Sequence, residues 1–399
     1  MLINKRVRQT YYKKNDNCGK KINIIFAPVS VSDGMAVNRR IKNIFNSIRK
    51  YINVSVENIV APDEDIADLI NNKYAKAVIM VQYIKKVIRY YEIYKKVLLR
   101  MNDSKNILYY SGGFGVFESI IFMCLRKAGC YVVIDILEDP RFYDRYNGVI
   151  PKIYKVINSY AINNVYRFVD GVVVISSHIE DYMNRLLISK KPLIKLPISI
   201  ERSDYNKSYI RNEVDVVKIF YGGSYGNKDC VEDIIQVFDA ITKNSNKKIK
   251  LILSGGLDVE SKAIIDPLLS RLHNDHISFV GYLNDEEYLK VIHQCDILCV
   301  PRKNIPYACA GYPFKLGEYL ATGNVVLSSA IKEVREMFSD DEVCFYDPDD
   351  KSDLYNKLNY LISNSQIREK IGNQGRIRAF DYFDADKHAV KFYEFINSL

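Results

Sequence analysis

The sequence predicts an α/β protein built from two doubly wound, Rossmann-like domains that face each other across a cleft. Short apolar runs, such as Ile22 to Phe26 and Val217 to Tyr221, fit strands buried on both faces of a parallel sheet. Each of these runs precedes a glycine-containing loop and then a helical segment, which is the order typical of doubly wound folds. The 399 residues, 48% of them apolar, are enough for two such cores.

The composition excludes several classes of protein. No apolar run approaches the roughly 18 residues of a spanning helix. The first 20 residues lack the apolar segment of a secretory signal, so a cytoplasmic location is expected. The eight cysteines form no CxxC pair, and the five histidines are scattered. We therefore expect reduced thiols, no disulfide framework, no metal site and no cofactor.

The net charge of +9 is distributed unevenly along the chain. Residues 1–200 hold 32 Lys and Arg against 17 Asp and Glu, a difference of +15, whereas residues 201–399 hold 25 against 31, a difference of −6. A basic half favours an anionic partner, such as a membrane leaflet or a pyrophosphate-linked lipid, although a solvated surface is the alternative. Nucleic acid is not expected, because no nucleic-acid-binding motif is recognisable.

Four segments follow from this pattern: a basic arm over 1–20, a first domain over 21–205, a second domain over 206–375, and a C-terminal helix over 376–399 that crosses back to the first domain. In the first domain, strands are expected near 22–26, 53–60, 106–110, 131–137 and 172–175. Helices are expected near 36–51, 116–128 and 151–169.

The stretch from 73 to 100 is apolar on one side and rich in Lys, Arg and Tyr on the other. Such a helix can lie on a membrane surface, so a peripheral contact with the inner leaflet is possible. A core-facing helix with a solvated basic face is the alternative, and the AVIM run at its start also fits a strand. The residues that would make the contact are Lys85, Lys86, Arg89, Lys95, Lys96 and Arg100.

Three loops of the first domain follow strands and are candidates for ligand contact, because ligands of doubly wound folds lie at the carboxyl ends of strands. Gly34 permits close approach of a ligand to the backbone. The SGGFG run at 111–115 does the same but is no dinucleotide fingerprint. Glu138 and Asp139 end the fourth strand, where they could bind acceptor hydroxyls; a capping or turn role for Asp139 is the alternative.

In the second domain, strands are expected near 217–221, 250–254, 277–280, 296–300, 325–327 and 343–346, and a helical segment runs from 367 to 399. The most informative stretch is GYPFKLGEYLATGNVVLSS at 311–329, a turn, a helix near 314–321 and a strand. Its helix start suits a phosphate, and Glu318 one turn further can accept bonds from two sugar hydroxyls. A nucleoside diphosphate fits this pattern, and an ordinary helix–strand unit is the alternative.

This stretch resembles the donor-site element of the GT-B glycosyltransferases of the group 1, or family 4, type. The matching residues are Pro313, Lys315, Leu316, Glu318, Tyr319, Ala321, Gly323, Val325 and Val326. The resemblance implies a GT-B fold, a nucleotide-sugar donor on the second domain, an acceptor on the first, retention of anomeric configuration, and no metal. It is strongest from 217 to 330.

The resemblance also assigns residues to the donor site. Gly223 and Lys228 match the family's Gly-Arg-x-Lys-Gly loop, where the Arg position holds Ser224. The implied donor-binding set is Gly34, Gly223, Ser224, Lys228, Tyr282, Arg302, Tyr312, Phe314, Lys315 and Glu318. Lys228 and Glu318 would also serve catalysis, and Glu138, with Asp135, matches an acceptor-side pattern.

The largest departure from the family is Ala310, which stands where the first Glu of the motif would contact the sugar. We expect a transferase that moves a sugar from a nucleotide-sugar, with UDP favoured, to a glycan or lipid-linked acceptor in bacterial-type polysaccharide or glycoconjugate assembly. The alternative is an inactive relative that binds an active enzyme as a partner. The missing Glu and the missing Arg favour this alternative slightly.

Overall fold

The computed structural model describes residues 21–27, 36–50, 53–58, 75–112, 114–139, 149–187, 191–206, 209, 215–226, 228–257, 259–272 and 274–399. The expected basic arm over 1–20 and the loop that holds Gly34 lie outside these residues. So do the side chains of Lys85 and Lys86.

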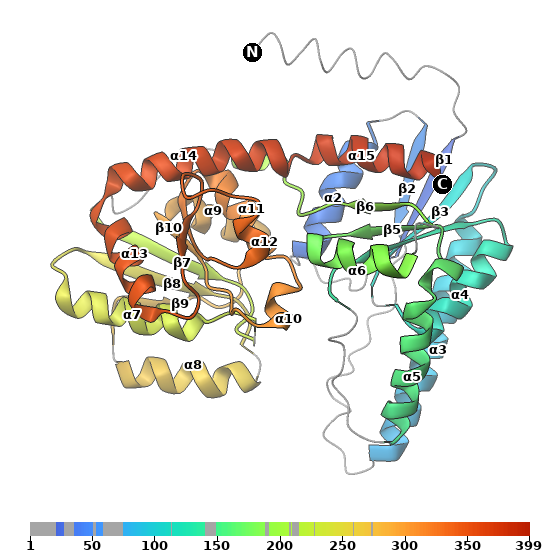
Figure 1. Ribbon diagram of the computed structural model, residues 1–399, viewed down its shortest axis with the longest axis horizontal. Helices are drawn as coiled ribbons and strands as arrows, with labels where there is room; N and C mark the ends of the chain where they lie inside the picture. Colours follow the sequence, from blue (N-terminus) through green and yellow to red (C-terminus); the bar gives the residue numbers. More distant parts are fainter. Residues whose placement is uncertain are drawn as a thin grey trace, which may run out of the picture.

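The first sheet has six strands among the described residues, paired in parallel in the order β2-β1-β3-β4-β5-β6 (Figure 1). These strands are β1 (Ile22–Ala27), β2 (Val54–Asn58), β3 (Lys105–Ser111), β4 (Tyr131–Ile136), β5 (Gly171–Val174) and β6 (Leu193–Lys195). The helices around them are α2 (Ala36–Ile48), α3 (Ala75–Arg100), α4 (Val116–Lys127), α5 (Val149–Asn163) and α6 (Ser177–Leu187), with the 3₁₀-helix η3 (Val165–Arg167).

The second sheet, also six parallel strands in the part of the chain described, runs β12-β11-β10-β7-β8-β9. Its strands are β7 (Val217–Gly222), β8 (Ile249–Ser254), β9 (Ile277–Phe279), β10 (Ile297–Val300), β11 (Val325–Ser329) and β12 (Cys344–Tyr346). The helices are η4 (Arg202–Tyr205), α7 (Val231–Asn244), α8 (Val259–Leu272), α9 (Asp285–Gln294), α10 (Pro306–Cys309), α11 (Lys315–Thr322), α12 (Lys332–Arg335), α13 (Lys351–Ser363), α14 (Ser365–Tyr382) and α15 (Ala385–Ser398).

Continuous apolar runs became strands because both faces of each sheet are covered. Every residue of β1 is buried. Its Ile24 packs into the cluster shared with α2 and α15, and the next residue, Ile25, packs into the cluster on the opposite face with α3 and α4. Side chains alternate across a strand, so a run without polar residues is what two covered faces require.

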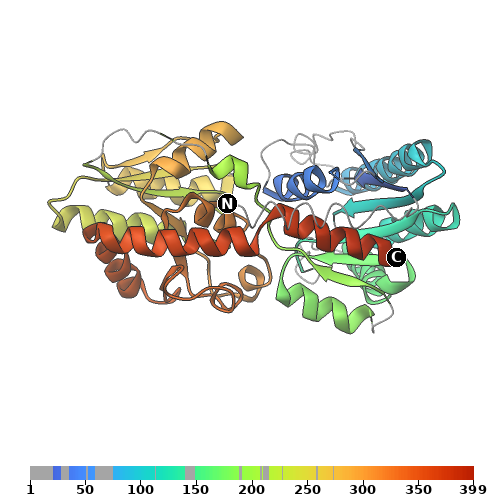
Figure 2. The same ribbon diagram turned by 90° about the horizontal axis from the view of Figure 1, so that it is seen from above.

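The last two helices join the halves of the molecule. Figures 1 and 2 show α14 along the second sheet and α15 continuing over the first. The single helical segment expected over 367–399 is interrupted at Phe383, a fully buried residue whose carbonyl accepts a 2.8 Å bond from the Ile200 amide. The Asp384 side chain then caps α15 through the amides of Asp386 and Lys387. Burial of Phe383 and this cap explain the interruption.

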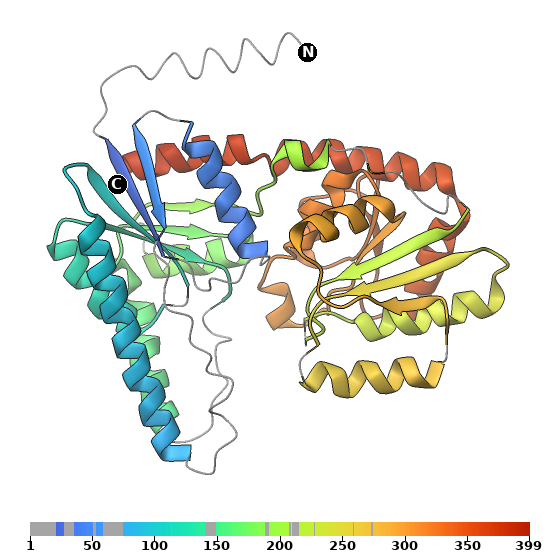
Figure 3. The same cartoon turned by 180° about the vertical axis from the view of Figure 1, so that it is seen from behind.

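The 73–100 stretch is helical throughout its described part, so the strand alternative for its first residues is wrong. Ile93 and Val97 are buried against the sheet and α4, whereas Leu99 is 75% exposed. Figures 1 and 3 agree that α3 and α5 lie side by side and extend beyond the first sheet. Within the described ranges, no helix has the length and apolarity needed to cross a bilayer.

Candidate functional site

Two loops at the carboxyl edge of the second sheet are bonded to each other. The loop after β7 meets the loop after β10, where the Cys230 amide donates to the Pro301 carbonyl at 2.6 Å and the Lys303 amide donates to the Lys228 carbonyl at 2.9 Å. Asp229 and Arg302 form an isolated bridge between them. The resulting platform brings Lys228 and Arg302, which are far apart in the sequence, to one edge of the sheet.

Glycines allow the backbone to approach closely at this edge. Gly223 and Gly255 have φ angles of +152° and +136°. A Cβ on Gly255 would lie 1.9 Å from the Gly223 carbonyl oxygen, and a Cβ on Gly223 would lie 2.9 Å from Lys315 Nζ. Any larger residue at these positions would displace backbone or a lysine. Ser224 follows as an exposed residue, and its carbonyl accepts a 2.5 Å bond from the Tyr221 hydroxyl.

Asp229 organises the cations of the platform. Its Oδ2 accepts from Lys315 Nζ at 2.8 Å and from the Tyr221 hydroxyl at 2.9 Å, and Arg302 Nε lies 3.8 Å from Oδ1. Burial acts to raise the pKa of Asp229, but the two neighbouring cations outweigh it and hold that pKa below its usual range. For Lys315 burial lowers the pKa of the ammonium, and the nearby Asp229 carboxylate opposes that shift.

Helix α11 carries the charged residues of the expected donor element. It begins at Lys315, one residue after Phe314, and ends at Gly323, which adopts the left-handed conformation at φ +82°. The Tyr319 hydroxyl accepts from the Gly222 amide at 3.0 Å and so ties the helix to the end of β7. The periodicity that places Tyr319 in the core also places Glu318 at the edge of the platform, with 5% of its surface exposed.

Glu318 is bonded to a residue of the first domain. Its carboxylate accepts from Arg39 Nη2 at 3.3 Å and from the Tyr288 hydroxyl at 2.9 Å, and Arg39 Nε lies 3.0 Å from its Oε1 in an ion pair. Arg39 also donates to Asp285 at 2.6 Å and lies 5.0 Å from the centre of the Tyr288 ring. Burial raises the pKa of Glu318, while Arg39 opposes the shift.

Sequence reasoning missed Arg39 as a site residue. It is part of an Arg-Arg pair in α2, a helix whose pattern says only that one face is polar. The partner of Arg39 on the other domain is 279 positions away. No local signal separates Arg39, which reaches the second domain, from Arg40, which is fully buried within the first.

Lys228 is also paired with the first domain. Its Nζ lies 2.5 Å from Glu138 Oε1 at the end of β4, and 4.5 Å from the centre of the Tyr307 ring. The structure therefore places Lys228 and Glu138, both expected from sequence at the cleft, in direct contact. Asp139 is buried next to Glu138, and its Oδ2 lies 2.9 Å from His178 Nε2. The residues that follow it, which a capping or turn role would involve, lie outside the described part of the chain.

Some expected site residues are placed differently. Asp135 is fully buried and bonded to Arg40 at 2.6 Å, so it offers no oxygen to an acceptor. Tyr312 is 2% exposed and packs on Phe383, so the donor contact expected of its side chain is not available in this arrangement. Both residues belong to strand or core patterns whose apolar neighbours bury them.

The other side chains expected to contact the donor differ in how far they are exposed to solvent. Tyr282 is 65% exposed, and Phe314 is half-buried at the start of α11. Arg302 is 7% exposed, and its Nη1 donates to the Gly311 carbonyl at 2.9 Å. Ala310 is buried, and its carbonyl lies 3.4 Å from the Ser176 hydroxyl of the first domain. The position of the family's first Glu is therefore packed against the opposite half of the molecule.

Comparison with known proteins identifies the second domain. Residues 206–378 match the family model of the glycosyl transferases group 1, and these residues include the platform and α11. The second domain therefore resembles the group 1 glycosyl transferases. No curated protein matches the sequence.

The structures of several glycosyl transferases share the fold of this one, which is GT-B. Sucrose-phosphate synthase from Thermosynechococcus elongatus matches with a TM-score of 0.68 and 13% identity, over 95% of this chain and 99% of that one. Anabaena HepE, in complex with UDP and glucose, matches with 0.64 and 12%, over 95% and 100%. A trehalose-6-phosphate synthase, studied for glycosyl transfer with retention, matches with 0.65 and 12%, over 94% and 99%.

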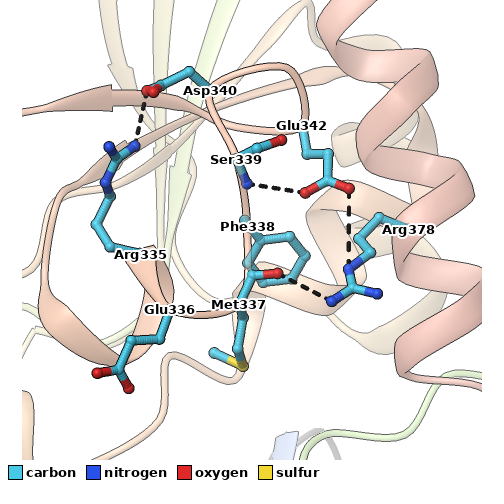
Figure 4. A pocket seen from close by; sticks show the side chains of 8 residues that line it. All are labelled: Arg335, Glu336, Met337, Phe338, Ser339, Asp340, Glu342 and Arg378. Carbon is cyan, nitrogen blue, oxygen red and sulfur yellow. Dashed lines mark hydrogen bonds and ion pairs between the residues drawn. The ribbon is translucent and has the colours of Figure 1, made fainter.

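The second domain also has a surface pocket away from the platform. Figure 4 shows it between α12, the following loop and α14, lined by Arg335, Glu336, Met337, Phe338, Ser339, Asp340, Glu342 and Arg378. Arg335 pairs with Asp340 at 2.8 Å, and the Ser339 amide donates to Glu342 at 2.9 Å. None of the donor-site residues expected from the sequence lines this pocket.

The described cysteines form no disulfide, and the described residues contain no cluster of metal-binding side chains. The cysteines that the structure describes are free thiols; most are buried or half-buried, and Cys124 is exposed. Burial raises the pKa of several of these thiols, to about 12 for Cys299. Over the described residues, no three His, Cys, Asp or Glu side chains gather as a metal ion would need.

Proposed function

We propose that this protein is a group 1 glycosyl transferase that moves a sugar from a nucleoside-diphosphate sugar to a glycan or lipid-linked acceptor, in bacterial-type polysaccharide or glycoconjugate assembly. The observation that carries the proposal is the position of Glu318. Its carboxylate lies at the carboxyl edge of the second sheet, on the helix that also brings Lys315 beside the Gly223 loop. A uridine donor is favoured, and the HepE complex with UDP supports that preference.

Each charged residue has a task in the proposed reaction. Glu318 accepts hydrogen bonds from the two ribose hydroxyls. Lys228, Lys315 and the backbone amides at the start of α11 offset the negative charge that develops on the leaving diphosphate. The reaction retains the anomeric configuration and needs no metal ion, because side-chain cations and backbone amides supply the compensating charge. The fold shared with the trehalose-6-phosphate synthase supports retention.

An inactive, partner-binding protein is the second candidate. The cations that the donor would need are already paired: Lys228 with Glu138, and Lys315 and Arg302 with Asp229. Ala310 and Ser224 also lack the charges that the family has at these positions. Hydrolysis of a UDP-sugar by the purified chain, however slow, would exclude this candidate.

The proposal is tested by ligand-induced stabilisation. A ligand that binds only the folded chain raises the melting temperature by mass action. We expect UDP to raise it more than GDP or dTDP, and Glu318→Ala to abolish both the shift and sugar transfer while the free protein still melts cooperatively. Glu342→Ala, which removes a carboxylate far from the platform, serves as the matched control. An undiminished UDP shift in Glu318→Ala would show that the donor site is elsewhere.

We also propose that the first domain rests on an anionic membrane leaflet. Helices α3, α4 and α5 carry exposed apolar side chains, namely Val87, Ile88, Tyr91, Leu98, Leu99, Ile120, Met123, Val156, Ile157 and Tyr160. Basic residues, including Lys95 and Lys96, lie on the same helix α3. Leu99→Asp should weaken co-sedimentation with phosphatidylglycerol vesicles, whereas Val259→Asp on the other domain should not. Equal sedimentation of both variants would contradict this contact.

A further inference from the structure

The two charged residues that would bind the ends of the donor are each paired with an oppositely charged residue of the first domain. Glu318, expected at the ribose, is bonded to Arg39 of α2. Lys228, expected at the diphosphate, is bonded to Glu138 after β4. Each partner presents the kind of group that a bound donor would place there. Arg39 offers hydrogen-bond donors to the Glu318 carboxylate, as ribose hydroxyls would, and Glu138 offers an anion to the Lys228 ammonium, as a phosphate would.

At the ribose end the occupation is complete. Arg39 faces both oxygens of Glu318: its Nε lies 3.0 Å from Oε1 in an ion pair, and its Nη2 donates to Oε2 at 3.3 Å. Oε2 also accepts from the Tyr288 hydroxyl at 2.9 Å. Two hydroxyls of a ribose need the same oxygens. Because Glu318 is 5% exposed, a ribose cannot simply add a second set of bonds from the solvent side. It must exchange with the Arg39 guanidinium.

The guanidinium has a place to remain after such an exchange. Arg39 Nη1 donates to Asp285 at 2.6 Å, and the guanidinium lies over the Tyr288 ring at 5.0 Å. Asp285 is about half-exposed at the first residue of α9. Arg39 therefore keeps a carboxylate partner when it releases Glu318, which reduces the electrostatic cost of the exchange.

At the diphosphate end, the Glu138 carboxylate lies beside the cation that a phosphate oxygen would approach. The side chains of Lys228 and Glu138 are 23% and 41% exposed, so this pair is open to solvent and weaker than the one at Glu318. A diphosphate carries more charge than one carboxylate and can replace Glu138 at Lys228. Repulsion between the two anions would then separate Glu138 from the second domain.

We propose that Arg39 and Glu138 are specificity-determining residues, each of which competes with one end of a nucleoside diphosphate. A ligand with only a ribose displaces Arg39, and a ligand with only a diphosphate displaces Glu138. A donor with both ends gains both sets of contacts and releases both cross-domain pairs, whereas a ligand whose contact at either end is weaker than the pair it must break is excluded. The proposal rests on the proposed function, because it needs Glu318 and Lys228 to bind a donor.

Calorimetric titration with three probes tests each competitor separately. Removal of Arg39 in Arg39→Ala should tighten binding of UDP and uridine about fivefold and leave pyrophosphate unchanged. Removal of Glu138 in Glu138→Ala should tighten binding of UDP and pyrophosphate by a similar factor and leave uridine unchanged. Arg39→Lys, which keeps the charge but not the two-point contact, should fall between wild type and Arg39→Ala.

Two variants control for loss of an ion pair that has no part in the cleft. Arg126→Ala breaks the pair with Asp170, and Glu180→Ala breaks the pair with Lys195, both within the first domain. Their exposed fractions of 30% and 31% are close to those of the cleft residues. Neither should change the affinity for any of the three probes.

The outcomes separate this proposal from the function on which it rests. Weaker or unchanged UDP binding in Arg39→Ala, together with lost binding in Glu318→Ala, would overturn the competition and leave the donor site standing. Binding of no UDP by wild type or by the Arg39→Ala, Glu138→Ala double variant would overturn both. Tightening by Arg39→Ala that persists in a Glu318→Ala background would also contradict the competition, because its target is then absent.

Discussion

Each domain holds an aspartate in an ion pair near the carboxyl edge of its sheet, but the two pairs differ in exposure. In the first domain, Asp135 and Arg40 are 2.6 Å apart, and neither side chain has any exposed surface. In the second domain, Asp229 and Lys315 are 2.8 Å apart, with 10% and 15% of their side chains exposed. Arg40 also donates to the carbonyls of Leu196 and Pro197.

This difference separates a structural charge from a charge that can serve a ligand. Arg40 joins α2, β4 and the segment that leaves the first domain, so its bonds are all made within the fold. Asp229 instead shares two cations and a tyrosine at the edge of the cleft, where one cation can turn to a phosphate while another still compensates the carboxylate. A buried ion pair with no exposed surface indicates stability, and a shared pair at a cleft indicates a binding site.

The comparison predicts the largest effect for Arg40. Arg40→Met leaves Asp135 buried without its cation, so the free energy of unfolding should fall by about 3–5 kcal/mol. Urea denaturation of the two forms measures it. The Arg40→Met, Asp135→Met double variant should recover much of the loss, because no uncompensated charge then remains. A loss below about 1 kcal/mol would show that water reaches Asp135.

Lys315→Met should act on binding more than on folding. Arg302 and Tyr221 still compensate Asp229, so the free energy of unfolding should fall by only about 1–2 kcal/mol. The affinity for UDP should fall about tenfold or more, which calorimetry would show. Lys243→Met removes a more exposed pair, with Asp239 on α7, and should leave UDP binding intact. A fall in stability as large as that of Arg40→Met would remove the distinction between the two sites.

His388 joins α15 to the segment that leaves the first domain, and it gives the chain a pH dependence. It lies in α15, 2.7 Å from the Ser199 hydroxyl, where burial lowers its pKa from 6.5 to about 3. Between these values the unfolded chain binds a proton that the folded chain does not, so stability is complete above about pH 6.5 and falls as the pH falls, by up to about 1.4 kcal/mol per unit. His388→Gln should flatten this slope in urea melts at pH 7 and 5. An equal slope in both proteins would mean that other groups set it.

Tyr312→Phe should have the smallest effect. The Tyr312 hydroxyl is buried and has no hydrogen-bond partner among the described residues. Its removal should leave stability unchanged or raise it by less than about 1 kcal/mol, and should not change UDP affinity. Tyr319→Phe is the contrasting variant, because it deprives the Gly222 amide of its acceptor and should cost about 1–2 kcal/mol. Weaker UDP binding in Tyr312→Phe would restore this residue to the donor site.

Local patterns predicted the elements of the second domain well. Strands near 217–221 and 325–327 were recognised because both faces of a parallel sheet demand apolar residues, and α11 because Gly323 ends it. The positions of Lys228, Lys315 and Glu318 at one edge followed from the parallel order of the strands. The interruption at Phe383 was missed, since its cause is a contact with Ile200 from another part of the chain.

The sequence by itself determined the α/β class, the two-domain arrangement of the GT-B fold and which charges stand at the carboxyl edge of the second sheet. Periodicity and glycine positions are local properties, and they place strands, loops and helices along the chain. Only the tertiary structure decided which of those charges are already paired. Arg39 and Glu318 are 279 positions apart in the sequence, and Asp229 and Lys315 are 86 positions apart, yet folding brings each pair within a few ångströms. Electrostatic energy depends on that distance and on burial, and neither is written in the order of the residues.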